Sequence, residues 1–164
     1  MFTTTLRSSL IIHNENTFII KEREVIPVFD YVHLLKATRN NLLTKDLHMN
    51  VNKACNEDEQ YASWSHIVTC YDIDKNSFLK QRQLSKITKK HVNPNLIPKM
   101  RVKYASQVCS KIFSNFINVV LNLSNGVVQT RKGIIKLPKG AAATFDMLYF
   151  FNNLFDSFNG IQGQ

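Results

Sequence analysis

Acidic residues are absent from a long stretch of the 164-residue chain, which has no Asp or Glu between Asp74 and Asp146. The same stretch is rich in Lys and Arg, and the formal net charge of the chain is +9. Cations at this density favour a polyanionic partner, either nucleic acid or nucleotide phosphate. The alternative is a solvated, lysine-rich surface without a partner. The cations are Lys75, Lys80, Arg82, Lys86, Lys89, Lys90, Lys99, Arg101, Lys103, Lys111, Arg131, Lys132, Lys136 and Lys139.

Three further absences exclude other classes of protein. The cysteines, Cys55, Cys70 and Cys109, form no Cys-x-x-Cys pair, so a disulfide framework is not expected. No run approaches the ~20 apolar residues that cross a bilayer, and residues 10–12 are too few for a signal-peptide core. No Gly-x-x-x-x-Gly-Lys-Ser/Thr sequence occurs, which excludes a P-loop. We therefore expect a soluble protein that is neither secreted nor bound to a membrane.

The first part of the chain has the pattern of two strands and a helix. Residues 17–20 and 25–29 are β-branched or aromatic runs, separated by a charged segment that predicts a turn. Residues 31–45 then predict an amphipathic helix with Lys36 and Arg39 on its polar face. Two strands alone are marginal in water, so we expect segments outside the chain to complete this sheet.

The rest of the chain predicts helices. Ser63 can cap a helix that continues to residue 71. The clearest helix spans residues 104–123, where apolar side chains repeat at threes and fours. It is stopped at Gly126, from which a basic, glycine-punctuated loop or hairpin leads to a last helix over residues 144–159.

Asp30 directly follows the second predicted strand, and cations follow it on the predicted helix. A carboxylate in this place suits a divalent metal ion such as magnesium, which prefers oxygen ligands. His33, Lys36 and Arg39 lie within two turns of it and could meet phosphates or orient the acid. The alternatives are that Asp30 caps the next helix and that His33 is a structural imidazole.

Three segments, in this order along the chain, resemble the P-element (THAP-type) DNA transposases. They are residues 29–43, the passage from Lys90 through Pro94 to residues 99–110, and residues 154–159. The resemblance covers roughly residues 16–160. It implies an α+β fold that is mostly α, with a strand-strand-helix piece of an RNase H-like catalytic domain at 1–46 and a helical GTP-binding insertion domain, incomplete at its C-terminal end, at 47–164.

The resemblance also implies a function. In the full-length enzyme the chain would support GTP-dependent cut-and-paste DNA transposition, with Asp30 as the second acid of a Mg²⁺-binding catalytic triad. The family supplies the other two acids from segments that we do not recognise here, so we expect the chain to be inactive alone. A non-catalytic DNA- or nucleotide-binding module derived from a transposon is the alternative.

In this family a terminal Phe-Asp-x-x-Asn segment contacts the guanine of GTP. Here it is Phe155-Asp156-Ser157-Phe158-Asn159, in which Asp156 would accept from the guanine N1 and N2 groups while Phe155 flanks the base. Asp156 and Asn159 are i, i+3 neighbours on one helix face. Core packing is the alternative reading of Phe155.

The basic passage supplies the remaining candidates that the resemblance implies. Lys99, Val102 and Lys103 are candidates for GTP binding, and DNA-binding candidates are distributed over two segments. The implied partners are transposon-end DNA and GTP, in a nuclear protein that forms a homo-oligomer at full length. The DNA-binding candidates are Lys36, Arg39, Lys89, Lys90 and Arg101.

Overall fold

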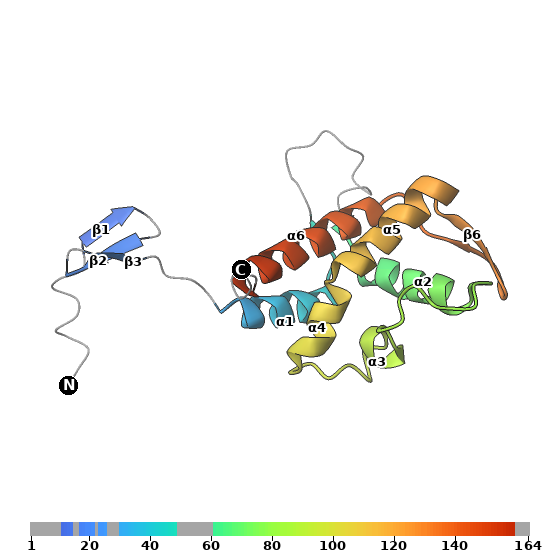
Figure 1. Cartoon of the computed structure of the whole chain (residues 1–164), viewed down its shortest axis with the longest axis horizontal. Helices are drawn as coiled ribbons and strands as arrows, with labels where there is room; N and C mark the ends of the chain where they lie inside the picture. The colour runs from blue at the N-terminus through green and yellow to red at the C-terminus, as the bar shows by residue number, and fades with distance from the viewer. Residues whose placement is uncertain (1–10, 15–16, 22, 26–29, 49–60, 160–164) are drawn as a thin grey trace. The chain divides into compact units, whose positions relative to one another are not determined.

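The structure is a computed structural model that describes residues 11–14, 17–21, 23–25, 30–48 and 61–159 (Figure 1). The chain divides into two compact units, residues 1–30 and residues 31–164. Helices predominate, and the strands form small antiparallel sheets, so the predicted fold class, α+β and mostly α, is confirmed. Among the described residues, no helix combines the length and the apolar character that crossing a bilayer requires.

The first unit contains a three-stranded antiparallel sheet. Its strands are β1 (Ile11–Asn14), β2 (Thr17–Ile20) and β3 (Arg23–Val25), paired in that order. The prediction of β2 is confirmed, whereas β1 was not predicted. The pairing of Ile20 with Arg23 confines the predicted turn to two residues, and Lys21 there has a φ of 48°. The rest of the second predicted strand, residues 26–29, lies outside the described residues.

The second unit begins with α1 (Tyr31–Leu42), which ends earlier than the predicted helix of residues 31–45. Two short strands follow, β4 (Leu47–His48) and β5 (Tyr61–Ala62), which pair with each other in antiparallel orientation. This pairing brings together the two ends of a polar segment, residues 46–61, at whose start the domain boundary 46/47 was predicted. Residues 49–60 of that segment lie outside the described residues, and the division into domains at 46/47 remains a prediction.

Helix α2 (Trp64–Lys75) starts at the predicted cap, where the Ser63 side chain accepts a hydrogen bond from the Ser65 backbone N–H. A short helix, α3 (Lys89–Val92), lies next to it. The indole Nε1 of Trp64 donates to the carbonyl oxygen of Val92 across 3.0 Å. This buried hydrogen bond ties α3, and the lysines that it carries, to the body of the second unit.

The single helix predicted over residues 104–123 is wrong, because the structure has two helices there. They are α4 (Val102–Val108) and α5 (Lys111–Ser124), with the break at Cys109 and Ser110. The Ser110 side chain accepts a hydrogen bond from the Phe113 backbone N–H and so caps α5. Serine competes for backbone hydrogen bonds in this way, which favours a helix start over continuation of the preceding helix.

A hairpin and a long helix complete the second unit. The hairpin, β6 (Val127–Thr130) and β7 (Gly133–Lys136), forms one of the two alternatives left open for the basic segment. Helix α6 (Ala141–Asn159) starts three residues before the predicted position and runs beside α5 (Figure 1). The core lies mainly between these helices and α2, with Phe113, Ile117 and Leu148 fully buried.

Candidate functional site

Helix α1 contacts both α4 and α6, the two helices that carry the predicted GTP-binding residues. At its first residue, Tyr31 packs edge-on against Phe155 at 5.5 Å between ring centroids and stacks on Phe158 at 4.9 Å. At position 39, the guanidinium of Arg39 contacts the segment that leads into α4. These two positions lie about 12 Å apart along the helix axis.

Arg39 is buried, with 1% of its surface exposed, so its predicted placement on the polar face of α1 is wrong. Its Nη2 donates to the Lys99 carbonyl oxygen across 2.8 Å, and its Nε donates to Asn40 Oδ1 across 2.9 Å. The burial arises because α4 and α6 both pack on α1 and cover more than its apolar stripe. A guanidinium in this position does not reach a DNA phosphate at the surface.

The second terminal nitrogen of Arg39, Nη1, is buried and has no hydrogen-bond partner among the described residues. Burial lowers the pKa of the Arg39 side chain from its ordinary value, with the nearby Cys109 acting in the opposite direction. A buried cation without a carboxylate partner is costly, and an apolar side chain of similar length often replaces such a charge at little cost. Arg39 therefore positions the start of α4 through one hydrogen bond rather than through an ion pair.

Replacement of Arg39 by Met should leave the free energy of unfolding within about 1 kcal/mol of wild type, or raise it, because a buried charge without a carboxylate partner is removed. Replacement by Ala should cost about 2 kcal/mol or more, because it leaves a cavity. Urea unfolding of wild type and the two variants measures these changes in the free energy of unfolding. A Met variant as unstable as the Ala variant would show that the hydrogen bond to Lys99 outweighs the burial of the charge.

Asp156 lies near the end of α6 with its carboxylate exposed. The amide Nδ2 of Asn152, one turn earlier, donates to Asp156 Oδ2 across 2.8 Å. The Oδ1 of the same amide accepts from the Lys111 backbone N–H across 2.9 Å, which fixes the orientation of Asn152 against the start of α5. Asn152 therefore orients the carboxylate that is predicted to bind guanine, a role that the sequence analysis missed. Its i, i+4 spacing from Asp156 is the sequence pattern that could have indicated this contact.

The other residues of the predicted guanine segment have different environments. Phe155 is half-buried, borders the core and contacts Tyr31, which fits the core-packing reading. Phe158 is exposed and presents its ring beside Tyr31. Asn159 is the last residue of α6, and its side chain lies outside the described residues. Asp156 is thus the member of the segment that presents an exposed charged group.

The predicted residues of the basic passage are exposed at and before the start of α4. Lys99, Arg101 and Lys103 have exposed side chains, whereas Val102 is half-buried. Lys103 lines a cleft together with Lys86, Lys89 and Lys90. The structure therefore brings a predicted GTP-binding lysine together with two lysines predicted to bind DNA.

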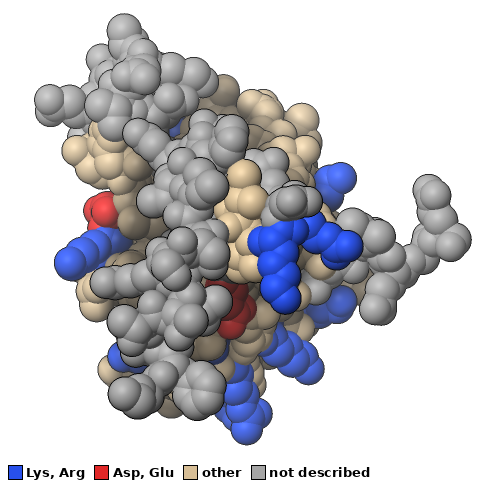
Figure 2. Space-filling model, turned by 90° about the vertical axis from the view of Figure 1, so that its left-hand side faces the viewer, with Lys and Arg blue, Asp and Glu red and all other residues tan. Residues whose placement is uncertain are grey.

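We call this feature the lysine cleft, which has a volume of about 550 Å³ and no carboxylate among its lining residues. It forms between α4 and the segment that contains α3, with basic side chains on both sides. On the face drawn in Figure 2, Lys and Arg side chains project as separate protrusions and few acidic side chains are visible. The residues that line the lysine cleft are Lys86, Thr88, Lys89, Lys90, His91, Lys103, Tyr104 and Gln107.

Asp30 is exposed and is the last residue of the first unit. In the part of the chain that the structure describes, no group of three or more His, Cys, Asp or Glu residues is placed to hold a metal ion. A two-metal site needs several carboxylates together, so the described residues supply Asp30 without the rest of such a site. The assignment of Asp30 to a catalytic triad remains a prediction. Lys36, half-buried on α1, likewise remains a predicted DNA contact.

The described cysteines offer no reactive thiol. Cys70 and Cys109 are both buried and unpaired, and burial raises the pKa of each to about 12. The thiolate is the nucleophilic form, so neither side chain is suited to covalent catalysis at neutral pH. Cys55 lies outside the described residues. The side chains that the site does present are carboxylate, ammonium and aromatic groups, which suit recognition of a ligand.

Comparison with known proteins places the chain in a family. No curated protein and no solved structure matches the sequence. A family model described as the TNP-like, GTP-binding insertion domain matches residues 32–163. The match covers most of the chain and includes α1, the lysine cleft and the Phe155–Asn159 segment, while it leaves the RNase H-like assignment of the first residues unsupported. The chain belongs to the TNP-like GTP-binding insertion domain family of transposase-related proteins.

Proposed function

We propose that the chain binds GTP through Asp156 and supports GTP-dependent cut-and-paste DNA transposition in the full-length transposase. The family match over residues 32–163 is the observation that carries this proposal. The geometry around Asp156 supports it, because Asn152 orients the carboxylate at an exposed helix end. Asp156 Oδ1 accepts no hydrogen bond within the described part of the chain, so it is available for a donor on a ligand.

Guanine presents an N1–H and an N2 amino group side by side, and a carboxylate can accept from both. Adenine offers an acceptor at N1 and carries no amino group at C2, so it lacks both donors. The ring of Phe158, stacked on Tyr31, provides an exposed aromatic surface close to Asp156 along α6. Asp156 is therefore the residue that would select the base, with Phe155 and Asn159 as its predicted neighbours in the site.

The proposal gives the remaining candidates supporting roles. Lys99, Val102 and Lys103 would complete the nucleotide site, and Lys36 and Arg101 would contact transposon-end DNA. Lys89 and Lys90, which the sequence also predicted to bind DNA, line the lysine cleft. Asp30 would bind Mg²⁺ with carboxylates from other segments of a nuclear, homo-oligomeric enzyme. Hydrolysis of GTP is not part of the proposal, because the sequence contains no P-loop.

Calorimetric titration of the chain with GTP, ATP and XTP tests the role of Asp156. Wild type should prefer GTP to ATP by about tenfold or more, because hydrogen bonds to a charged acceptor are among the stronger ones. Asp156→Asn replaces one acceptor oxygen with a donor amide. It should therefore lose GTP affinity and gain affinity for XTP, whose C2 carbonyl accepts a hydrogen bond.

Asp146→Asn is the matched control, because Asp146 is an exposed carboxylate on the same helix and the substitution removes the same charge. This variant should retain the preference of wild type for GTP. Equal affinities for the three nucleotides in wild type and in Asp156→Asn would mean that the end of α6 is only a packed helix. If Asp156→Asn and Asp146→Asn lose the same GTP affinity, the effect comes from the change in net charge and not from recognition of the base.

A further inference from the structure

We propose that the lysine cleft holds the phosphate groups of the bound nucleotide, an inference that rests on the proposed GTP binding. Lys86 precedes α3, Lys89 and Lys90 belong to α3, and Lys103 belongs to α4, and these four lysines line one cleft. All four side chains are exposed, and none forms an ion pair within the described part of the chain. Ammonium groups on long, flexible side chains act as point charges and adapt well to phosphate oxygens.

The lining of the cleft includes a hydrogen-bond network that joins Thr88, His91 and Gln107. The Thr88 backbone N–H donates to His91 Nδ1 across 3.0 Å, so Nδ1 acts as an acceptor there. With Nδ1 as an acceptor, Nε2 is the ring nitrogen that donates to Gln107 Oε1, across 2.8 Å. The amide nitrogen of Gln107 forms no hydrogen bond with a described side chain, so it can donate to an anion in the cleft.

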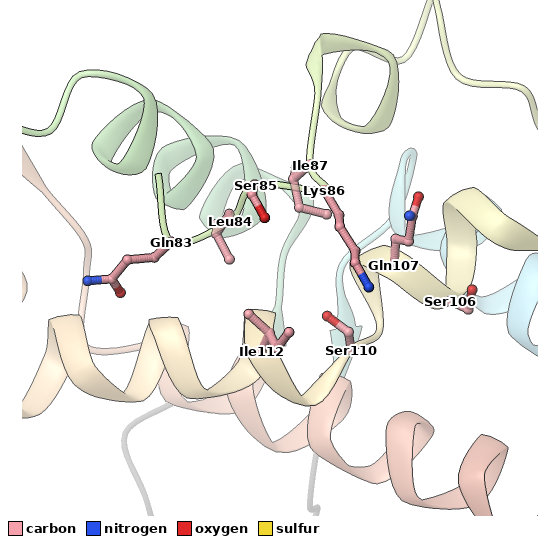
Figure 3. Close-up of a pocket in the computed structure, with 9 residues that line it drawn as sticks. All are labelled: Gln83, Leu84, Ser85, Lys86, Ile87, Ser106, Gln107, Ser110 and Ile112. Carbon is pink, nitrogen blue, oxygen red and sulfur yellow. The ribbon is translucent and has the colours of Figure 1, made fainter. Parts of the chain in front are cut away.

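A second cavity of about 200 Å³ adjoins the lysine cleft and shares Lys86 and Gln107 with it. Ser106 and Ser110 contribute hydroxyl groups to this chamber, and Ile112 contributes part of its apolar wall. Figure 3 shows the Lys86 side chain extending from the segment before α3 toward Ser110. The two cavities together offer ammonium, amide and hydroxyl groups, which suit the oxygens of phosphates and of a ribose.

The shape of the cleft favours a compact phosphate chain over the backbone of DNA. Its volume lies within the range of about 300 to 1,000 Å³ that is typical of small-molecule sites. Cations on opposite sides of a concavity can surround terminal phosphate oxygens, whereas a DNA duplex presents its phosphates along a convex surface. Lys103, which the family resemblance assigns to GTP, lies inside this concavity.

Titration with GTP, GDP and guanosine, with inorganic triphosphate as competitor, tests the inference on the whole chain. Wild-type affinity should fall in the order GTP, GDP, guanosine, and inorganic triphosphate should displace GTP. Lys90→Ala and Lys103→Ala should each weaken GTP binding by about tenfold while leaving guanosine binding unchanged. Both lysines are exposed, so the thermal midpoint of each variant should stay at the wild-type value.

Lys132→Ala is the matched control, since Lys132 is exposed in the turn between β6 and β7 and lines neither cavity. It should change GTP affinity less than twofold. If Lys90→Ala and Lys103→Ala bind GTP as tightly as wild type does, the inference about the cleft is wrong and the proposed function is unaffected. Loss of duplex DNA binding in these variants, with GTP binding unchanged, would assign the cleft to nucleic acid. Absence of GTP binding by wild type would overturn the proposed function and this inference together.

Discussion

Replacement of Asp74 by Ala will lower the free energy of unfolding by about 3 kcal/mol, because a buried carboxylate with three hydrogen-bond donors is removed. Asp74, on the last turn of α2, is 3% exposed. Its Oδ1 accepts from the backbone N–H groups of Gln83 and Leu84 across 2.7 and 3.2 Å, and its Oδ2 accepts from Arg82 Nε across 2.8 Å. Without Asp74, the buried N–H of Leu84 loses its acceptor.

The same substitution should disturb the chamber next to the lysine cleft. Gln83 and Leu84 line that chamber, and Asp74 holds their backbone in place. Asp74→Asn keeps the volume and one acceptor oxygen, so we expect it to lose less stability than Asp74→Ala. The measurement is urea unfolding followed by far-UV circular dichroism.

Asp72→Ala provides the control, because Asp72 is half-buried on the same helix and its side chain makes no hydrogen bond in the described part of the chain. A change of about 0.5 kcal/mol or less is expected for this variant. If Asp72→Ala and Asp74→Ala lose the same stability, the three hydrogen bonds do not anchor the segment after α2. Comparable stability of Asp74→Ala and wild type would lead to the same conclusion.

Local patterns in the sequence predicted several elements of the fold. The apolar repeat identified the region of α5, and Ser63 marked the start of α2 where its side chain caps the helix. The break before α5 could not be read from the same repeat, because the apolar spacing continues through Cys109. Ser110 ends one helix and begins another by a local hydrogen bond that competes with helix continuation.

Tertiary contacts decided the features that the sequence did not predict. Arg39 has the charge of a surface residue, yet packing of α1 against two helices buries it. The lysine cleft depends on the folding of α3 beside α4, so the meeting of Lys90 with Lys103 is not visible in their spacing. The affinity for polyanions that the acid-free stretch predicts stays a prediction, which the two binding proposals assign to named residues.

The hydrogen bonds around Asp156 and His91 show how a candidate site acquires its shape from residues outside the recognised motif. Asn152 lies outside the Phe-Asp-x-x-Asn segment, and it links Asp156 to the first turn of α5. Gln107 lies on α4 and is oriented by His91 of α3. Each of these amides has a role only after the helices have packed, so sequence patterns identify the charged group and miss the residue that orients it.

Replacement of Gly126 by Ala will destabilise the second unit by about 3 kcal/mol or more. Gly126 follows α5 with a φ of 74°, and its carbonyl oxygen accepts from the Leu137 backbone N–H across 2.7 Å. A methyl group at this position would overlap the carbonyl oxygen of Leu137, which is backbone and cannot rotate away. The cost therefore combines strain in a left-handed conformation with the separation of Leu137 from the end of α5.

Gly133→Ala separates these two contributions, because Gly133 also has a positive φ, 110°, but faces open space. Strain alone should cost about 1 to 3 kcal/mol there. A larger loss of stability in Gly126→Ala than in Gly133→Ala, measured by thermal unfolding at equal protein concentration, would give the cost of the steric overlap. Equal losses would show that the backbone at Leu137 moves aside. In that case the packing of the β6–β7 hairpin would not hold the position of α5, the helix whose residue Ile112 lines the chamber.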